Sequence, residues 1–222
     1  MSAAARMDKT DWENKLRKIE AAYRFEYGYK LLYCPWETIY HHKLVFLSLN
    51  PGTRTPHGCD PVERTISDER GNSYEVEQFN SRSPISGQFL RMCEFMGVAP
   101  ADVLTGAVAP FRSQSWKALT VRQRDASLDF GRRFWGRALQ SRPQNTGIIA
   151  CSKRAANLVV SLLGANLEKE LGTGWGHYRI RRFRTKEGRL IVGLPHLSRF
   201  KLFGRAESEP YLEAALEDLS LH

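Results

Sequence analysis

The chain has 222 residues, enough for one domain with a continuous buried core. Apolar residues make up 42% of it and charged residues 26%, proportions that exclude a disordered chain. No run approaches the roughly 20 consecutive apolar residues of a membrane span. The N-terminus becomes charged before the apolar core of a signal peptide could form, so we expect a cytoplasmic protein that does not bind membranes.

Lys and Arg number 33 against 24 Asp and Glu, which gives a formal net charge of +9. This excess favours a polyanionic partner, because each neutralised phosphate releases condensed counterions. The cysteines are scattered and form no C-x-x-C pair, so we expect reduced thiols and neither a zinc site nor an iron–sulfur cluster. We expect no metal and no other cofactor. The four cysteines are Cys34, Cys59, Cys93 and Cys151.

Hydrophobic spacing predicts helices and strands that alternate along the chain. Residues 11–31 carry apolar side chains at intervals of three and four, which predicts a helix within an N-terminal extension over about residues 8–31. Residues 53–83 are polar and rich in turn formers, and we interpret them as a long irregular loop. Strands are predicted at 43–49, 103–108, 147–151, 177–183 and 189–194. Further helices are predicted at 89–96 with Gly97 as the stop, and at 127–140, 153–163 and 210–219.

This alternation predicts an α/β fold, a three-layer α/β/α sandwich with a central, mostly parallel sheet. Residues 1–222 are expected to form a single domain that is monomeric and needs no protein partner. In such sheets, ligands bind where the strands end at their carboxyl ends. Asn50, Pro110, Cys151 and His196 follow or end predicted strands, so the chemistry is expected there.

Two short motifs stand at the first and last of these strand ends. SLNPG (residues 48–52) ends a buried strand in a sharp turn, which fixes the amide of Asn50 at the sheet edge and lets a ligand approach Gly52 closely. LPHLSR (residues 194–199) places His196 after the last strand. Either motif alone has an ordinary explanation, as a good turn or as a structural histidine. Their combination, in this order, points to a site.

SLNPG resembles the first motif of the uracil-DNA glycosylase superfamily, in the G-x-N-P-G form of the mismatch-specific and single-strand-selective branches. PHLSR resembles the late H-P-S motif of that superfamily. SPISGQFLRMCEFMG, VLTGAVAPFRS and GIIACSKRAANLVV lie between them in family order, so the resemblance spans roughly residues 43–203. It implies a monofunctional DNA glycosylase. Such an enzyme flips a nucleotide out of single- or double-stranded DNA, hydrolyses the bond between base and sugar, and leaves an abasic site.

The resemblance also implies roles for individual residues. Asn50 would position the attacking water, and His196 would donate a hydrogen bond to the O2 atom of the base as negative charge develops there. The residues expected to hold the base are Leu49, Gly52, Phe79, Ile85, Gly106, Ala107 and Phe111. Ser198 is expected on a phosphate, and Arg199 and Phe200 along the minor groove or in the gap left by the flipped nucleotide. The other expected DNA contacts are Arg112, Ser113, Ser152 and Lys153.

The chain departs from the family pattern in three places. The aromatic residue expected to stack on the base has no clear match, since Ile85 stands near its usual place with Phe79 nearby. The late motif reads His-Leu-Ser, and Gly106 and Ala107 stand where the family often has an asparagine that reads the Watson–Crick edge of uracil. Small residues there indicate either relaxed specificity or a pocket opened for a larger base. The expected substrate is therefore uracil or a modified pyrimidine. The alternatives are a bulky hypermodified pyrimidine of phage DNA, or a DNA-binding protein of the same fold without catalysis.

Two other segments could be mistaken for sites. The arginines of residues 179–184 are interpreted either as a rim that follows phosphates or as a solvated hairpin, and both remain open. GTGWG (residues 172–176) is predicted to follow a helix and lacks the Gly-x-x-Gly ending, which argues against dinucleotide binding. A metal-dependent nuclease is disfavoured, because no clustered Asp, Glu and His residues suggest a two-metal site.

Overall fold

A computed structural model of the chain describes residues 6–53, 62–80, 83–140 and 146–219, with the backbone alone for 78–80. Its centre is a six-stranded sheet of order β4-β2-β5-β8-β7-β6. The first four strands in this order are parallel, and β7 and β6 are antiparallel to their neighbours. The predicted α/β fold with a mostly parallel sheet is thus confirmed. The bounds are β4 (Val103–Ala107), β2 (Leu44–Ser48), β5 (Ile148–Cys151), β8 (Leu190–Leu194), β7 (Ile180–Arg184) and β6 (Asn166–Leu171).

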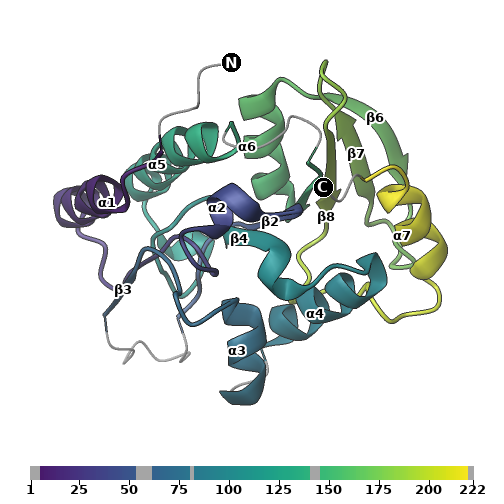
Figure 1. The fold of residues 1–222 in the computed structure, drawn as a ribbon, viewed down its shortest axis with the longest axis horizontal. Helices are drawn as coiled ribbons and strands as arrows, with labels where there is room; N and C mark the ends of the chain where they lie inside the picture. The colour runs from purple at the N-terminus through teal and green to yellow at the C-terminus, as the bar shows by residue number, and fades with distance from the viewer. Residues whose placement is uncertain (1–5, 54–61, 81–82, 141–145, 220–222) are drawn as a thin grey trace.

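Helices cover both faces of this sheet (Figure 1). Alternate residues of a strand point to opposite faces, and the buried strands divide their side chains accordingly. Val45 and Leu47 pack with the core under α1, α5 and α6, whereas Leu44 and Phe46 pack with the core under α3, α4 and α7. The helices are α1 (Lys9–Tyr23), α5 (Val121–Ala138), α6 (Lys153–Leu163), α3 (Ser73–Asn80), α4 (Pro84–Met96) and α7 (Glu209–Leu216).

Smaller elements surround the end of the sheet where β2 and β4 finish. A two-stranded parallel sheet pairs β1 (Gly28–Lys30) with β3 (Glu63–Thr65). The backbone N–H of Lys30 donates to the carbonyl of Pro110 at 2.9 Å, which ties β1 to the segment after β4. The remaining elements are α2 (Thr38–His41), η1 (Pro100–Asp102) and η2 (Trp116–Ala118).

Several predicted elements are confirmed with small changes at their ends. The helix predicted at 153–163 is α6, with the predicted bounds, and Gly97 ends α4 with a left-handed φ of 63°. Three predictions are wrong. The first helix ends at Tyr23, because Arg24 adopts φ 53°, and residues 28–30 form β1. The predicted irregular loop at 53–83 contains β3 and α3, and GTGWG follows a strand, β6.

The parallel order determines where polar groups meet. β2, β4, β5 and β8 all finish at one edge of the sheet, at Ser48, Ala107, Cys151 and Leu194. The segments that leave these four ends therefore lie side by side, although they are far apart in the chain. Within the described ranges, no helix combines the length and apolar character needed to cross a membrane.

A candidate active site at the carboxyl edge of the sheet

Asn50 lies two residues beyond the end of β2, and its amide is held in one orientation. Its Nδ2 donates to the carbonyl of Pro51 at 3.1 Å and to the Ser113 hydroxyl oxygen at 2.9 Å. A carbonyl can only accept, so the nitrogen must face this side. Both amide hydrogens are engaged in this way, and no described residue donates a hydrogen bond to Oδ1. The oxygen is left as an acceptor for a water or a ligand.

His196 lies two residues beyond the end of β8, and its own loop fixes its tautomer. The backbone N–H of Ser198 donates to Nδ1 at 3.3 Å, and the Ser198 hydroxyl lies 2.7 Å from the same atom. Because a backbone N–H can only donate, Nδ1 is the acceptor, and a neutral ring carries its proton on Nε2. Burial, reinforced by the nearby Arg199, lowers the pKa of His196. At pH 7 the ring is therefore a neutral imidazole, and its Nε2–H donates to no described residue.

The two motifs flank the end of β5, which lies between β2 and β8. Neighbouring strands are about 4.8 Å apart, so β2 and β8, which lead into Asn50 and His196, run roughly 10 Å apart. The backbone N–H of Leu197 donates to the Cys151 sulfur at 3.2 Å, which fastens the His196 loop to β5. The segment that follows β5, beginning at Ser152, therefore lies between the Asn50 turn, which offers an acceptor, and the His196 loop, which offers a donor.

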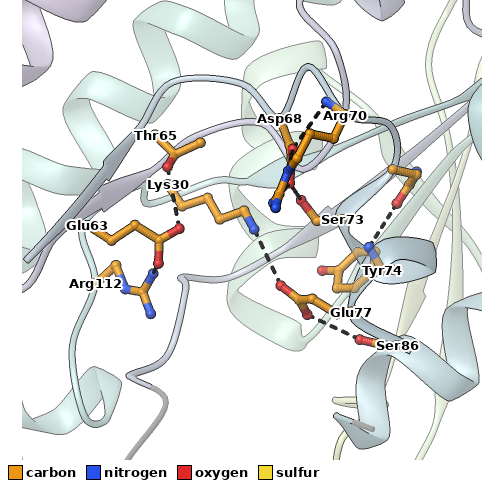
Figure 2. Close-up of polar contacts among 11 residues, drawn as sticks. Lys30, Glu63, Thr65, Asp68, Arg70, Ser73, Tyr74, Glu77, Ser86 and Arg112 are labelled. Carbon is orange, nitrogen blue, oxygen red and sulfur yellow. Dashed lines mark hydrogen bonds and ion pairs between the residues drawn. The ribbon is translucent and has the colours of Figure 1, made fainter. Parts of the chain in front are cut away.

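Arg112 directly precedes Ser113, the hydrogen-bond partner of Asn50, and belongs to a cluster of charged side chains (Figure 2). Lys30 is buried with its Nζ 3.4 Å from Glu77 Oε1 and 4.9 Å from the centre of the Tyr33 ring. Arg112 is buried and paired with Glu63. A buried cation needs such partners, because an uncompensated charge in the interior costs several kcal/mol. The cluster joins β1, β3 and α3 to the segment that follows β4.

Two stacked tyrosines close this side of the site. The rings of Tyr33 and Tyr74 lie 5.1 Å apart between centres, and both side chains are buried. Burial raises the pKa of each phenol well above its ordinary value, and the side chain of Ser48 offsets part of that rise. Both remain protonated at physiological pH. Sequence reasoning missed these residues and Lys30, whose partner Glu77 is 47 positions away in a segment predicted to be irregular.

The residues predicted to hold the base divide into two groups. Leu49 is buried directly after β2, and Gly52 is exposed and pairs with Ser113 as an isolated bridge. Ile85 is partly buried at the start of α4. Phe79 lies in α3, but its side chain falls outside the described residues.

The other predicted base contacts are interior packing positions. Phe111 is fully buried and stacks on Phe25 with 3.9 Å between ring centres. Ala107 is fully buried as well. A Cβ atom on Gly106 would lie 2.6 Å from the carbonyl oxygen of Leu31 and 2.7 Å from the Trp135 ring. The space next to Gly106 is filled by protein, so its small size does not open a pocket.

The predicted DNA contacts also divide. Arg112 and Ser113 are buried, with Arg112 committed to Glu63 and Ser113 to Asn50, so neither is placed to track a phosphate. Lys153 and Arg199 are exposed at the edge of the sheet. Ser198 is half-buried on His196, and Ser152 is half-buried as the cap of α6, where its hydroxyl accepts from the N–H of Ala155 at 3.2 Å. A single cavity has Ser152, Lys153, His196 and Phe200 among its lining.

The described cysteines lie apart as free, buried thiols. Burial raises the pKa of Cys34 to about 11 and those of Cys93 and Cys151 to about 12, so all three are protonated and unreactive at neutral pH. Cys59 falls outside the described residues. In the described part of the chain, no three His, Cys, Asp or Glu side chains gather where they could hold a metal ion.

A comparison with models of known protein families gives no match, and a comparison with curated proteins gives no significant similarity.

Proposed function

We propose that the chain is a monofunctional DNA glycosylase, which hydrolyses the bond between a flipped-out uracil or modified pyrimidine and its sugar in DNA. Asn50 positions the water, and His196 donates a hydrogen bond to the leaving base. The observation that carries the proposal is an amide oxygen beyond β2 and an imidazole N–H beyond β8, neither of which is hydrogen-bonded to a described residue. The motif resemblance to the uracil-DNA glycosylase superfamily supports it.

The state of His196 suits this reaction. Rupture of the glycosidic bond leaves negative charge on the base, and a donor already aimed at that position stabilises the transition state. The Ser198 N–H holds Nδ1 as an acceptor, so Nε2 is the donating atom without any change of tautomer. A lowered pKa keeps the ring neutral at pH 7, and it therefore serves as a hydrogen-bond donor without carrying a charge.

The state of Asn50 suits the other half of the reaction. With Nδ2 held by Pro51 and Ser113, Oδ1 can accept a hydrogen bond from a water and orient it toward the sugar. An amide activates water less than a carboxylate does, because it is not a base at neutral pH. We therefore expect modest turnover, with most of the rate enhancement coming from stabilisation of the negative charge on the departing base.

The surroundings of Gly106 bear on the size of base that the site would accept. A bulky pyrimidine is an alternative because small residues stand where the family often has an asparagine, which could leave space for a larger base. The space next to Gly106 is filled by Trp135 and the Leu31 carbonyl. This favours a base of ordinary size, with uracil first. The base would then be recognised by other polar groups around the strand ends, because Gly106 provides no side-chain donor or acceptor.

The test is excision from labelled oligonucleotides in EDTA, with alkali to cleave abasic sites. The panel contains uracil, hypoxanthine, 5-hydroxymethyluracil and glycosylated hydroxymethylcytosine, each in single- and double-stranded DNA. Removal of one preorganised donor costs about 10²–10³ in kcat in comparable sites, so His196→Ala, which removes the imidazole N–H, should lower kcat by this factor. Asn50→Ala should also be strongly impaired.

Two exposed residues provide matched controls, His41→Ala in α2 and Asn166→Ala in β6, and both variants should excise at the parental rate. An Asn50→Ala variant as fast as the parent would refute the water-positioning role. Duplex binding with strong salt dependence but no abasic product on any base would instead favour a non-catalytic DNA-binding protein.

A further inference from the structure

A cleft of about 350 Å³ lies beside His196, on the face of the sheet that α6 covers. Its lining comes from β7 and β8, from the start of α6, and from the loop segments 177–179 and 195–200. We propose that this cleft binds one nucleotide, with its phosphate on the cationic residues and its base against the aromatic ones. The chemistry of the lining, its size and its position each support this.

The lining is cationic. It includes Lys153, Arg179 and Arg181, and no described residue of the lining is a carboxylate. Arg181 is paired with Glu170 outside the lining, and the charges of Arg179 and Lys153 also act on this carboxylate, so three cations share one neighbouring carboxylate. The first turn of α6 also begins here, and the N-terminal end of a helix favours an anion. An anionic group is therefore expected to occupy this part of the cleft.

Aromatic side chains provide the second half of the recognition. The rings of His177 and Tyr178 stack with 4.6 Å between centres, and Tyr178 lies 4.1 Å from Phe200. Tyr178 is 40% exposed, unusually open for a large apolar ring. Nucleobases stack on such surfaces irrespective of their sequence, at about 1–3 kcal/mol per base. Cations and exposed aromatic rings in one cleft fit a nucleotide better than a bare phosphate or an apolar ligand.

The volume and position refine the assignment. Pockets for small ligands measure about 300–1,000 Å³, so this cleft suits one nucleotide and is too small for a longer segment. His196 belongs to its lining, so a nucleotide here would lie next to the candidate active site. The source is either a free nucleotide or the neighbour of the target nucleotide in a DNA strand. Only the second source rests on the proposed function.

The test measures binding and needs no excision. Isothermal titration at low salt would compare thymidine 5′-monophosphate, thymidine and a short oligothymidylate. Lys153→Gln should weaken binding of the phosphate-bearing ligands about three- to tenfold, as for the loss of one charge-assisted contact. Tyr178→Ala should weaken them by a similar factor through lost stacking. Lys186→Gln is the matched control, because Lys186 is equally exposed but lies in the turn between β7 and β8, at the opposite edge of the sheet.

The outcomes separate the alternatives. Monophosphate binding that both cleft variants weaken, with thymidine binding poorly, would support the cleft as a site for a free nucleotide. Binding of the oligonucleotide alone, weakened by the same variants, would support a nucleotide of a strand. Equal affinity in the parent, the cleft variants and Lys186→Gln would overturn the proposal. Asn50→Ala keeps this test distinct from the proposed function, since it should lose excision and still bind.

Discussion

Gly106 offers the sharpest test of how the end of β4 is built. An alanine there would place Cβ 2.6 Å from the Leu31 carbonyl oxygen and 2.7 Å and 2.9 Å from two ring carbons of Trp135. Neither neighbour is free to move. The Leu31 oxygen accepts the N–H of Ala107 at 2.9 Å, and the Trp135 indole N–H donates to the Ala107 carbonyl at 2.9 Å. The added methyl must therefore distort the strand or break one of these hydrogen bonds.

Overpacking of this kind costs about 1–3 kcal/mol, so we expect Gly106→Ala to lower the free energy of unfolding by that amount. For a domain of this size, each kcal/mol shifts Tm by about 2–4 °C. Urea denaturation followed by tryptophan fluorescence, together with calorimetry, measures both. Gly87→Ala is the control, because nothing lies within 4 Å of its Cβ position in α4, and it should be neutral or stabilising.

A Gly106→Ala variant within about 0.5 kcal/mol of the parent, the usual range for substitutions away from such features, would refute this reasoning. The result also bears on specificity. Because the position is filled, Gly106→Asn should destabilise the protein further and should not add a group that reads uracil. A stable Gly106→Asn variant with faster uracil excision would show that the end of β4 faces the base.

Two other substitutions and one labelling experiment test the charges and thiols around the site. Arg199→Gln removes the like charge beside His196 and should raise the pKa of that ring, although burial, the larger cause, should keep it below its ordinary value. The acid limb of excision should move to higher pH in step, and NMR titration of the ring protons in the free protein measures the shift. Glu63→Gln leaves the buried Arg112 without its carboxylate and should cost about 1–3 kcal/mol in urea denaturation, whereas an unchanged midpoint would contradict the pairing. Cys151, whose pKa is raised to about 12, should resist iodoacetamide in the native protein, and peptide mass spectrometry would detect any labelling.

The sheet could be predicted because its buried strands are short apolar runs that stop at turn formers. The sequence of β6 gives no such signal. Its residues, Asn166–Leu171, are exposed and mostly polar, and they form a strand only because they pair with β7. β3 and α3 were missed for a related reason, since their contacts are with β1 and α4 and not within their own segment. Tertiary pairing overrides local preference at such positions.

For the site, the sequence indicated where polar groups would gather but not which ones would be exposed. Asn50 and His196 lie at the predicted edge because parallel strands bring their carboxyl ends together. Arg112 was expected on DNA, yet it is buried against Glu63, 49 positions earlier in the chain. No spacing rule links these two residues. Burial depends on the packing of β3 against the segment after β4, which no pattern in either segment reveals.

The place of β8 in the sheet has a consequence for how the protein can be made. β8 follows all the other described strands in the chain, yet it lies inside the sheet between β5 and β7. A nascent chain that has not yet released residues 190–194 therefore lacks an interior strand, and β5 and β7 have an unpaired edge where β8 will insert. Such edges bind other strands readily. Early folding on the ribosome should thus be limited to β2, β4 and β5 with their helices. The candidate site is completed only when β8 inserts and brings His196 to the edge where Asn50 already lies.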